Sequence, residues 1–143
     1  MILVDANILL YTKDSLSEPH QAARTWWDAQ LSGTATVGLS WPVLMAFIRI
    51  GTNSRLHRSS LTLKDAIVHV QGWLDQPCVR LLEPTAAHWG IFQKMLLGGN
   101  AAANLVTDAH LAALAVEHNA VLYSTDADFS RFPGLKWKNP LAK

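Results

Sequence analysis

The sequence predicts an α/β fold in which a central, mainly parallel sheet carries helices on both faces. Short apolar runs of strand length alternate with longer segments that show helix-start signals and helical periodicity. This alternation is typical of strands joined by helical crossovers. The chain has 143 residues, a length that suits one hydrophobic core, so we expect a single domain over residues 1–143.

Apolar runs and helical periodicity place the expected elements along the chain. The predicted strands are residues 1–4, 34–39, 79–82 and 120–123, with a last one within residues 132–137. The predicted helices are residues 21–31, 43–48, 62–73, 85–97 and 105–118. No internal repeat or low-complexity tract interrupts this pattern, which agrees with a single folding unit.

Two helix starts share one signal, a serine two positions before a proline. Ser17 precedes Pro19 at the first of them. Ser40 precedes Pro42 at the second. Serine caps free backbone N–H groups, and proline suits a first turn because its fixed φ is already helical. The helix after Pro42 is mostly apolar, so we expect it to be buried.

Capping and turn residues also delimit the helices of the second half. Thr62 and Asp65 form a capping-box pattern, with Asp in place of the preferred Glu. Pro77 ends that helix. Thr85 opens the following helix, and a flexible break over residues 98–100 ends it.

The helix over residues 105–118 carries a carboxylate close to its start. Leu111, Leu114 and Ala115 fall at helical spacing and define its buried face. Asp108 lies about one turn before Leu111 on the same face. We therefore expect the side chain of Asp108 to point inward near the N-terminal end of the helix.

Composition limits the class of protein. The net charge is +1, so a surface for a polyanionic partner must be local. Cys78 is the single cysteine, which excludes an internal disulfide or a cysteine-based zinc site. No run reaches the ~20 apolar residues of a membrane span, and we expect a soluble cytoplasmic protein without a membrane partner. The six tryptophans are expected to lie mostly in the core, with one or two at a binding surface.

Aspartates occur where predicted strands and helices meet solvent. They are Asp5 after the first strand, Asp108 near a helix start, and Asp126 and Asp128 after the strand over residues 120–123. Ligands bind at the carboxyl ends of the strands in open α/β sheets, so we expect an acidic pocket there. Converging carboxylates repel each other, and oxygen ligands favour Mg²⁺ or Mn²⁺. Such a site suits phosphodiester hydrolysis, in which the metal ion activates the attacking water.

Each of these aspartates also has a plain structural interpretation. Asp5 can form a turn, and Asp108 can complement the positive N-terminus of its helix. One of Asp126 and Asp128 can serve only as a loop anchor. The functional interpretation therefore depends on all three acidic segments occurring together.

Three segments carry a family resemblance. They are residues 1–10 (MILVDANILL), residues 106–115 (VTDAHLAALA) and residues 122–129 (LYSTDADF). In this order and spacing they resemble the PIN-domain ribonucleases, and the VapC-type toxins most closely. Residues 41–50 and 132–141 also look like that group. The resemblance spans almost the whole chain and implies a three-layer α/β/α PIN-like fold.

The resemblance implies an Mg²⁺-dependent endoribonuclease in which Mn²⁺ can substitute. Such toxins often cut tRNA or rRNA, are restrained by a cognate VapB-type antitoxin, and usually form homodimers. The site residues that it implies are Asp5, Asp108 and Asp126 as metal ligands, Asp128 as a further catalytic residue, and Asn7 and Ser124 as residues that order the site.

One position departs from the family pattern. Most such proteins carry a further glutamate at or near Ala46, whereas this chain has no Asp or Glu from Ala29 to Leu63. The number of bound metal ions is therefore open, and a non-catalytic PIN-like module that binds RNA or protein is the alternative function. An aspartate-nucleophile phosphatase is a weaker alternative, because the segment after Asp5 lacks the second aspartate of such a phosphotransfer loop.

Two further regions are candidate binding surfaces. Arg49, Arg55 and Arg58 lie in a stretch without acidic residues and are candidates for RNA contacts, although a solvated helix end has the same composition. The apolar segments over residues 26–27 and 43–50 can form a groove for an amphipathic segment of an antitoxin. Core packing is the alternative for both segments.

Overall fold

The fold is a parallel sheet with helices on both faces. The computed structural model describes residues 1–57 and 60–142. Within these ranges one sheet has the strand order β3-β2-β1-β4-β5, and each neighbouring pair is parallel. The strands are β1 (Ile2–Val4), β2 (Val37–Leu39), β3 (Val79–Leu81), β4 (Val121–Tyr123) and β5 (Trp137–Lys138). The expectation of a central parallel sheet is confirmed.

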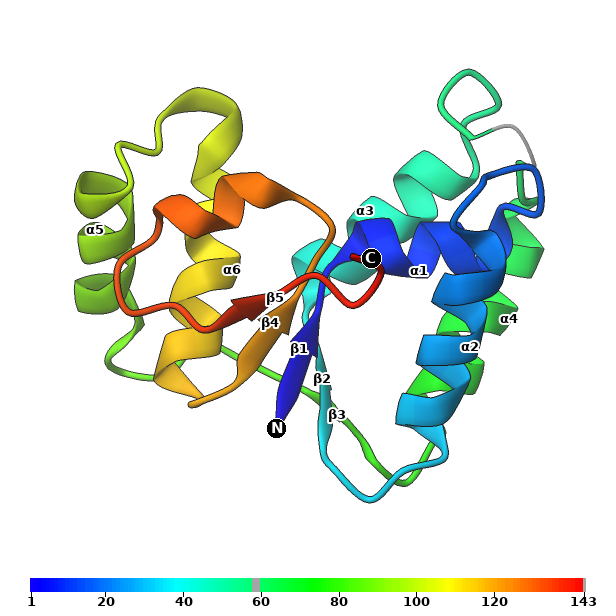
Figure 1. Ribbon diagram of the computed structural model, residues 1–143, viewed down its shortest axis with the longest axis horizontal. Helices are drawn as coiled ribbons and strands as arrows, with labels where there is room; N and C mark the ends of the chain where they lie inside the picture. The colour runs from blue at the N-terminus through cyan, green and yellow to red at the C-terminus, as the bar shows by residue number, and fades with distance from the viewer. Residues whose placement is uncertain (58–59, 143) are drawn as a thin grey trace.

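The helices form the two outer layers. They are α1 (Ala6–Lys13), α2 (His20–Leu31), α3 (Trp41–Gly51), α4 (Leu63–Leu74), α5 (His88–Gly98) and α6 (Val106–Glu117), with short 3₁₀ helices η1 (Ala103–Leu105) and η2 (Ala127–Arg131). Figure 1 shows α5 and α6 on one side of the sheet and α1 to α4 on the other. The three-layer α/β/α architecture is therefore confirmed. Over the described residues, none of the helices has the length and apolar character needed to cross a membrane.

Helix α1 was not among the helices predicted from the sequence, which assigned no element to residues 6–13. Asp5 is its N-cap, and the Asp5 Oδ1 atom accepts a hydrogen bond from the N–H of Ala6 at 2.7 Å. Lys13 lies in the last turn, where a cation complements the helix dipole. The eight residues of α1 are mostly apolar, and Ile8 and Leu9 are fully buried. The sequence of α1 therefore lacks the polar stripe by which a surface helix is recognised.

Two of the predicted helix starts are confirmed in atomic detail. The Ser40 Oγ atom accepts a hydrogen bond from the N–H of Val43 at 3.4 Å, and Pro42 lies in the first turn of α3. At α4, Thr62 Oγ accepts from the N–H of Asp65 at 3.0 Å, and Asp65 accepts in return from the N–H of Thr62 at 3.4 Å. The capping box is complete even though Asp replaces Glu.

The predicted cap of one other helix and the predicted start of another were wrong, although the helix expected over residues 21–31 is present. Helix α2 begins at His20, and its N-cap Pro19 offers no side chain for capping, because Ser17 Oγ donates instead to the carbonyl of Asp14 at 2.8 Å. Helix α5 begins at His88 rather than Thr85. Thr85 instead accepts a hydrogen bond from the N–H of Ala87 at 3.2 Å, in a turn that precedes the helix.

The tryptophans differ in how far they are buried. Trp27 and Trp73 are core residues, so Trp27 offers no surface to a partner. Trp41 is 48% exposed and Trp89 is 64% exposed.

Helix α3 is not wholly buried, contrary to the expectation, because Met45 is 59% exposed on its outer face. The apolar character of α3 thus includes an outward-facing side as well as a core-facing one.

The strand order brings two chain segments together at the carboxyl edge of the sheet. The order reverses at β1, which pairs with β2 on one side and with β4 on the other. Loops that leave adjacent strands at such a switch point diverge and open a crevice. Asp5 follows β1 and Ser124 follows β4 at this edge. The sheet thereby sets the position of the candidate site.

A pair of glycine substitutions tests the packing of the sheet. A Cβ atom on Gly38 would lie 2.5 Å from Leu82 Cδ1 and 3.0 Å from the carbonyl oxygen of Ile2, whereas one on Gly72 would meet nothing within 4 Å. We expect Gly38→Ala to lower the free energy of unfolding by roughly 2 kcal/mol through overpacking. Gly72→Ala, on the exposed side of the last turn of α4, should raise it by about 0.5 kcal/mol. Urea unfolding of both variants measures the two changes, and equal effects would contradict this packing.

Candidate metal centre

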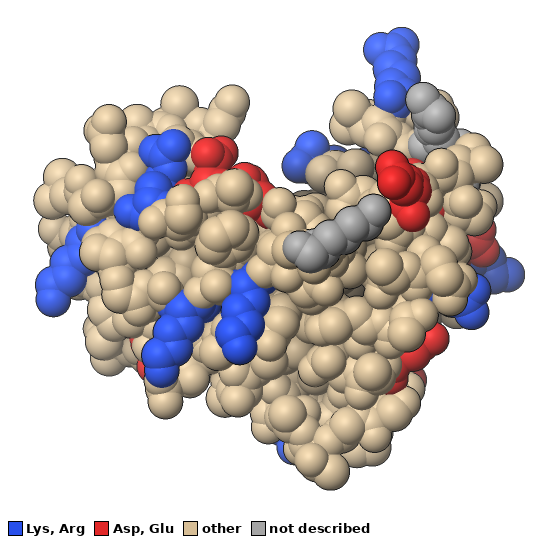
Figure 2. All heavy atoms as spheres, viewed as in Figure 1, with Lys and Arg blue, Asp and Glu red and all other residues tan. Residues whose placement is uncertain are grey.

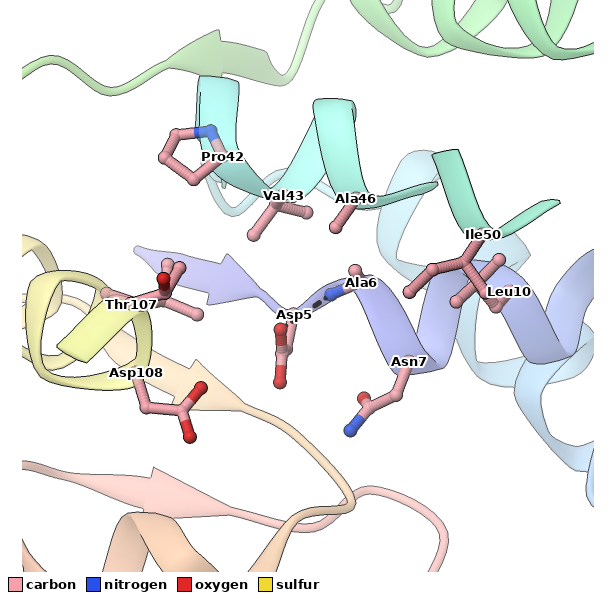
Figure 3. A pocket seen from close by; sticks show the side chains of 11 residues that line it. Asp5, Ala6, Asn7, Leu10, Pro42, Val43, Ala46, Ile50, Thr107 and Asp108 are labelled. Carbon is pink, nitrogen blue, oxygen red and sulfur yellow. Dashed lines mark hydrogen bonds between the residues drawn. The ribbon is translucent and has the colours of Figure 1, made fainter. Parts of the chain in front are cut away.

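The carboxylates of Asp5 and Asp108 meet in one pocket of about 230 Å³. Figure 3 shows Asp5 entering it from the end of β1 and Asp108 from the first turn of α6, with both carboxylates directed into the same space. The lining residues are Asp5, Ala6, Asn7, Leu10, Pro42, Val43, Ala46, Ile50, Thr107, Asp108 and Leu111. The sequence expectation that Asp108 points inward from a helix start agrees with this geometry.

Ser124 joins the segments around Asp5. Its buried hydroxyl donates to Asp5 Oδ2 at 2.7 Å. It also accepts from Asn7 Nδ2 at 3.1 Å and from the N–H of Asp126 at 3.0 Å. One donor and two acceptor positions are all that a hydroxyl offers, so Ser124 is fully used. These three bonds hold the Asp5 carboxylate in one orientation and fix the turn after β4 against α1.

The acidic side chains carry uncompensated negative charge. Burial raises the pKa of Asp5 above 3.8, although hydrogen bonds from Ser124 and the Ala6 N–H oppose the shift, and the charge of Asp126 adds to it. Burial raises the pKa of Asp108 to about 6, with further contributions from the charges of Asp5, Asp126 and Asp128 and a small opposing one from Arg131. A cation in the pocket would relieve this repulsion.

Asp126 and Asp128 lie beside the pocket and are not among its lining residues. Asp126 is the N-cap of η2, and its Oδ1 atom accepts from the N–H of Asp128 at 2.9 Å. Asp128 is exposed and pairs with Arg131 at 3.7 Å. The loop-anchor interpretation therefore describes Asp126 well, while the charge of both residues still reaches Asp108.

The pocket fits a metal ion held by few protein ligands. No group of three or more His, Cys, Asp and Glu side chains that could hold an ion occurs among residues 1–57 and 60–142. Mg²⁺ is commonly bound by only one or two carboxylates, and water and substrate phosphate oxygens complete its shell. Each oxygen of Asp5 accepts one hydrogen bond and keeps capacity for a cation. Asp5 and Asp108 thus suit Mg²⁺ or Mn²⁺ and not a closed four-ligand site.

The opposite wall of the pocket is apolar, which the sequence did not indicate. Ala46 lies on this wall, so the position of the missing glutamate does face the pocket. Its neighbours on α3 are Pro42, Val43 and Ile50, and Leu10 comes from α1. A spacing of three and four residues along α3 is the signal that could have placed these side chains on one face.

The candidate RNA-contacting arginines lie at the end of α3 and after it. Arg49 and Arg55 are exposed, and Arg58 lies outside the described residues. Arg49 is adjacent in the chain to Ile50, a lining residue of the pocket. Figure 2 shows acidic side chains gathered beside the notch between the two helical layers, with basic side chains on either side of it. This arrangement places cations close to an acidic centre without filling it.

Metal affinity should depend on pH through Asp108. Because the pKa of Asp108 is about 6, protons compete with the metal ion, and we expect Mn²⁺ affinity to fall as the pH is lowered through that value. In the metal-free protein the folded state binds more protons than the unfolded chain, since the ordinary pKa is 3.8. Stability should therefore decline as the pH rises from about 4 to about 7, and Asp108→Asn should remove part of this decline. Calorimetric Mn²⁺ titrations and thermal melts across this range measure both effects; a pH-independent affinity would contradict the assignment.

Comparison with known proteins identifies the family. The PIN-domain family model matches residues 2–135. The chain belongs to the PIN-domain family. Ribonuclease VapC37 of Mycobacterium tuberculosis is 46% identical over 142 residues, which cover 99% of each chain. Ribonuclease VapC33 of the same species is 40% identical over 141 residues, again with 99% of each chain covered. Within the PIN-domain family, this chain is therefore a relative of the VapC ribonucleases over its full length.

Solved structures agree in fold. The crystal structure of VapBC2 from Rickettsia felis, bound to a DNA fragment of its promoter, contains a chain that superimposes with a TM-score of 0.70 at 17% identity. The match covers 97% of this chain and 98% of that one. At this identity the likeness establishes the PIN-domain architecture and no detail of the site.

Proposed function

We propose that this PIN-domain protein is a divalent-metal-dependent endoribonuclease of the VapC toxin type, with Mg²⁺ as its ion. The main observation behind this proposal is that the carboxylates of Asp5 and Asp108 line one pocket at the carboxyl edge of the sheet. Burial, together with the neighbouring carboxylates, raises the pKa of both residues, so their charged forms are unfavourable there without a cation. A phosphodiester cannot approach such a site unless a cation offsets that charge. The full-length relation to two VapC ribonucleases supports the same activity.

Each residue of the proposed centre has a distinct task. A bound Mg²⁺ supplies charge neutralisation at the phosphate and lowers the pKa of a water molecule. Asp5 and Asp108 would hold the ion through their carboxylate oxygens. Ser124 fixes the rotamer of Asp5 through its 2.7 Å hydrogen bond. Asn7 lines the pocket beside Asp5 and is positioned to orient water or a phosphate oxygen.

Asp126 and Asp128 complete the acidic set in this proposal. Both charges raise the pKa of Asp108, so both increase the attraction of the pocket for a cation. Asp126 is held in place by its capping bond to the N–H of Asp128. We propose that Asp126 acts on the bound ion through its charge or through a water molecule of the ion's shell, and that Asp128 assists at the exposed rim.

RNA cleavage by the purified protein tests this function. Total RNA, tRNA and rRNA are incubated with Mg²⁺, with Mn²⁺ and with EDTA, and the fragment ends are mapped. We expect discrete cuts in tRNA or rRNA with either metal ion and intact RNA in EDTA. Metal-independent cutting, or no cutting by folded protein that binds Mn²⁺, would refute the proposal.

The partner of the proposed toxin is a VapB-type antitoxin. A basic side chain of the antitoxin would be attracted to the carboxylates of Asp5 and Asp108, where it competes with the metal ion. Co-expression with the cognate antitoxin should give a complex that does not cut RNA, and hydrogen exchange should show protection around the pocket. We also propose a homodimer, for which sedimentation equilibrium of the purified protein gives the mass.

The structure gives one reason to keep a second candidate. Ala46 faces the pocket where most PIN-domain nucleases carry a carboxylate, so a non-catalytic module that binds RNA or protein is the alternative function. Mn²⁺ calorimetry separates the two. Metal binding that is lost in Asp5→Ala supports the nuclease, because a binding module has no need of that ion.

A further inference from the structure

We propose that the apolar wall opposite Asp5 and Asp108 binds one unpaired nucleobase next to the scissile phosphate. This inference rests on the proposed ribonuclease function and names its substrate class, which is RNA with an unstacked nucleotide at the cleavage site. The wall consists of Leu10, Pro42, Val43, Ala46 and Ile50.

The wall and the carboxylates are two sides of the same pocket. Val43 and Ala46 of α3 line the same pocket as Asp5 and Asp108. Figure 3 shows the two α3 residues on one side of Asp5, with the carboxylate of Asp5 directed away from them. Ile50 and Leu10 extend the apolar side along α3 and α1. A ligand that fills this pocket must therefore present a charged or polar group to one side and an apolar face to the other.

A nucleotide has both a charged group and an apolar face. Its phosphate would meet the ion held by Asp5 and Asp108, while the flat face of the adjacent base lies against the aliphatic wall. Bases that leave the helical stack are commonly held against apolar or aromatic side chains in this way. Thr107 and Asn7 at the polar side offer hydroxyl and amide groups to the edge of a base.

Size limits the occupant to a single base. The pocket has about 230 Å³, below the ~300–1,000 Å³ of pockets that enclose a whole drug-sized ligand. Ala46 leaves room for the base, because its methyl group does not fill the space that a longer side chain would occupy. A base within a duplex is stacked between its neighbours and cannot enter such a pocket, so the nucleotide must be unpaired or extruded.

An apolar side chain of a protein partner is the competing occupant. In the metal-free protein, a peptide with a basic side chain beside the apolar one would match both sides of the pocket. With Mg²⁺ bound, the ion occupies the carboxylates and attracts a phosphate oxygen rather than a basic side chain. The pairing of an acidic metal side with an apolar side in one small pocket therefore favours RNA over a peptide.

Substrates that lack one base test the proposal. The cleavage site in a short oligoribonucleotide is first mapped, and then each flanking nucleotide in turn is replaced by a tetrahydrofuran abasic analogue. Wild-type protein should lose roughly tenfold in kcat/KM with one abasic substrate and little with the other, because burial of one face of the base against aliphatic side chains removes apolar area from water. Ala46→Leu, which fills the pocket, should cut the intact RNA as slowly as wild type cuts the sensitive abasic one and should no longer distinguish the two.

Met45→Leu is the matched control, because Met45 neighbours Ala46 on α3 but is 59% exposed outside the pocket. It should retain the wild-type discrimination. Mn²⁺ affinity of Ala46→Leu should equal that of wild type, which shows that the carboxylates are intact. Equal cleavage of intact and abasic RNA by the wild-type protein would overturn the base site while leaving the nuclease standing.

A binding measurement gives a readout that does not need cleavage. Methyl NMR signals of Val43 and Ile50 should shift on addition of nucleoside 5′-monophosphates with Mg²⁺ and not on addition of ribose 5-phosphate with Mg²⁺. Shifts with both ligands, or with neither, would contradict the base site. If instead the signals respond only to a peptide from the antitoxin, the wall is a protein-docking surface and the proposal is wrong.

Discussion

Asp5→Asn and Asp108→Asn are each expected to reduce metal-dependent RNA cleavage at least ~1,000-fold, since the metal ion contributes several kcal/mol to the transition state. Both substitutions remove a charged oxygen ligand while keeping the shape of the side chain. The fold should survive, because burial of the Asp5 carboxylate is unfavourable, as its raised pKa shows. Single-turnover cleavage with Mg²⁺ measures the loss.

Asp75→Asn is the matched control for these two variants. Asp75 is an exposed aspartate just after α4, where it accepts a hydrogen bond from Gln71 Nε2 at 2.8 Å. We expect this variant to cut RNA at the wild-type rate. The assignment of the metal ligands would be wrong if Asp5→Asn or Asp108→Asn retained more than about a tenth of the activity while Mn²⁺ binding was unchanged.

Glu117→Ala should have the largest effect on stability, a loss of about 3 kcal/mol in the free energy of unfolding. The buried Glu117 carboxylate accepts from the N–H of Thr85 at 2.8 Å and contacts His88 Nδ1 at 2.5 Å. His88 Nε2 in turn lies 3.0 Å from His110 Nδ1, so the network joins α5 to α6. Alanine would leave the Thr85 N–H and the His88 ring without their partner.

Glu117→Gln separates this hydrogen-bond network from simple packing. Glutamine keeps the volume and the oxygen that accepts from Thr85, so we expect it to cost less than half as much as alanine in urea unfolding. Helix α6 also carries Asp108, and Glu117→Ala should therefore weaken Mn²⁺ binding in addition to stability. Equal stability of the alanine variant and the wild type would contradict the role given to this network.

The sequence predicted the centre of the sheet because β1 and β2 are buried throughout, and β1 reads as a continuous apolar run. Capping residues predicted the starts of α3 and α4, where a side-chain oxygen competes for the first free N–H groups. Helix α1 was missed because its apolar residues directly continue those of β1, and Asp5 serves both as the end of one and as the cap of the other. Local signals do not separate two elements that share a boundary residue.

Some parts of the candidate site could be predicted from the sequence and others could not. Asp5 and Asp108 could be predicted because each carboxylate follows or opens an element whose position in an α/β sheet is fixed by topology. The spacing along α3 could place the α3 residues of the apolar wall on one helix face, but not predict that this face lines the acidic pocket, since that depends on tertiary packing. The hydrogen bond from Ser124 to Asp5 could not be predicted either. It depends on the pairing of β1 with β4, which brings together residues distant in the chain.

Crystals grown with Mn²⁺ provide the most direct test of the central claim, that Asp5 and Asp108 together hold a catalytic metal ion. Anomalous scattering locates Mn²⁺ independently of any assumption about activity. We predict a peak between the carboxylates of Asp5 and Asp108, at ligand distances of about 2.0–2.2 Å, that disappears in Asp5→Asn crystals. A pocket without a peak at millimolar Mn²⁺, or a peak that persists in Asp5→Asn, would contradict the claim.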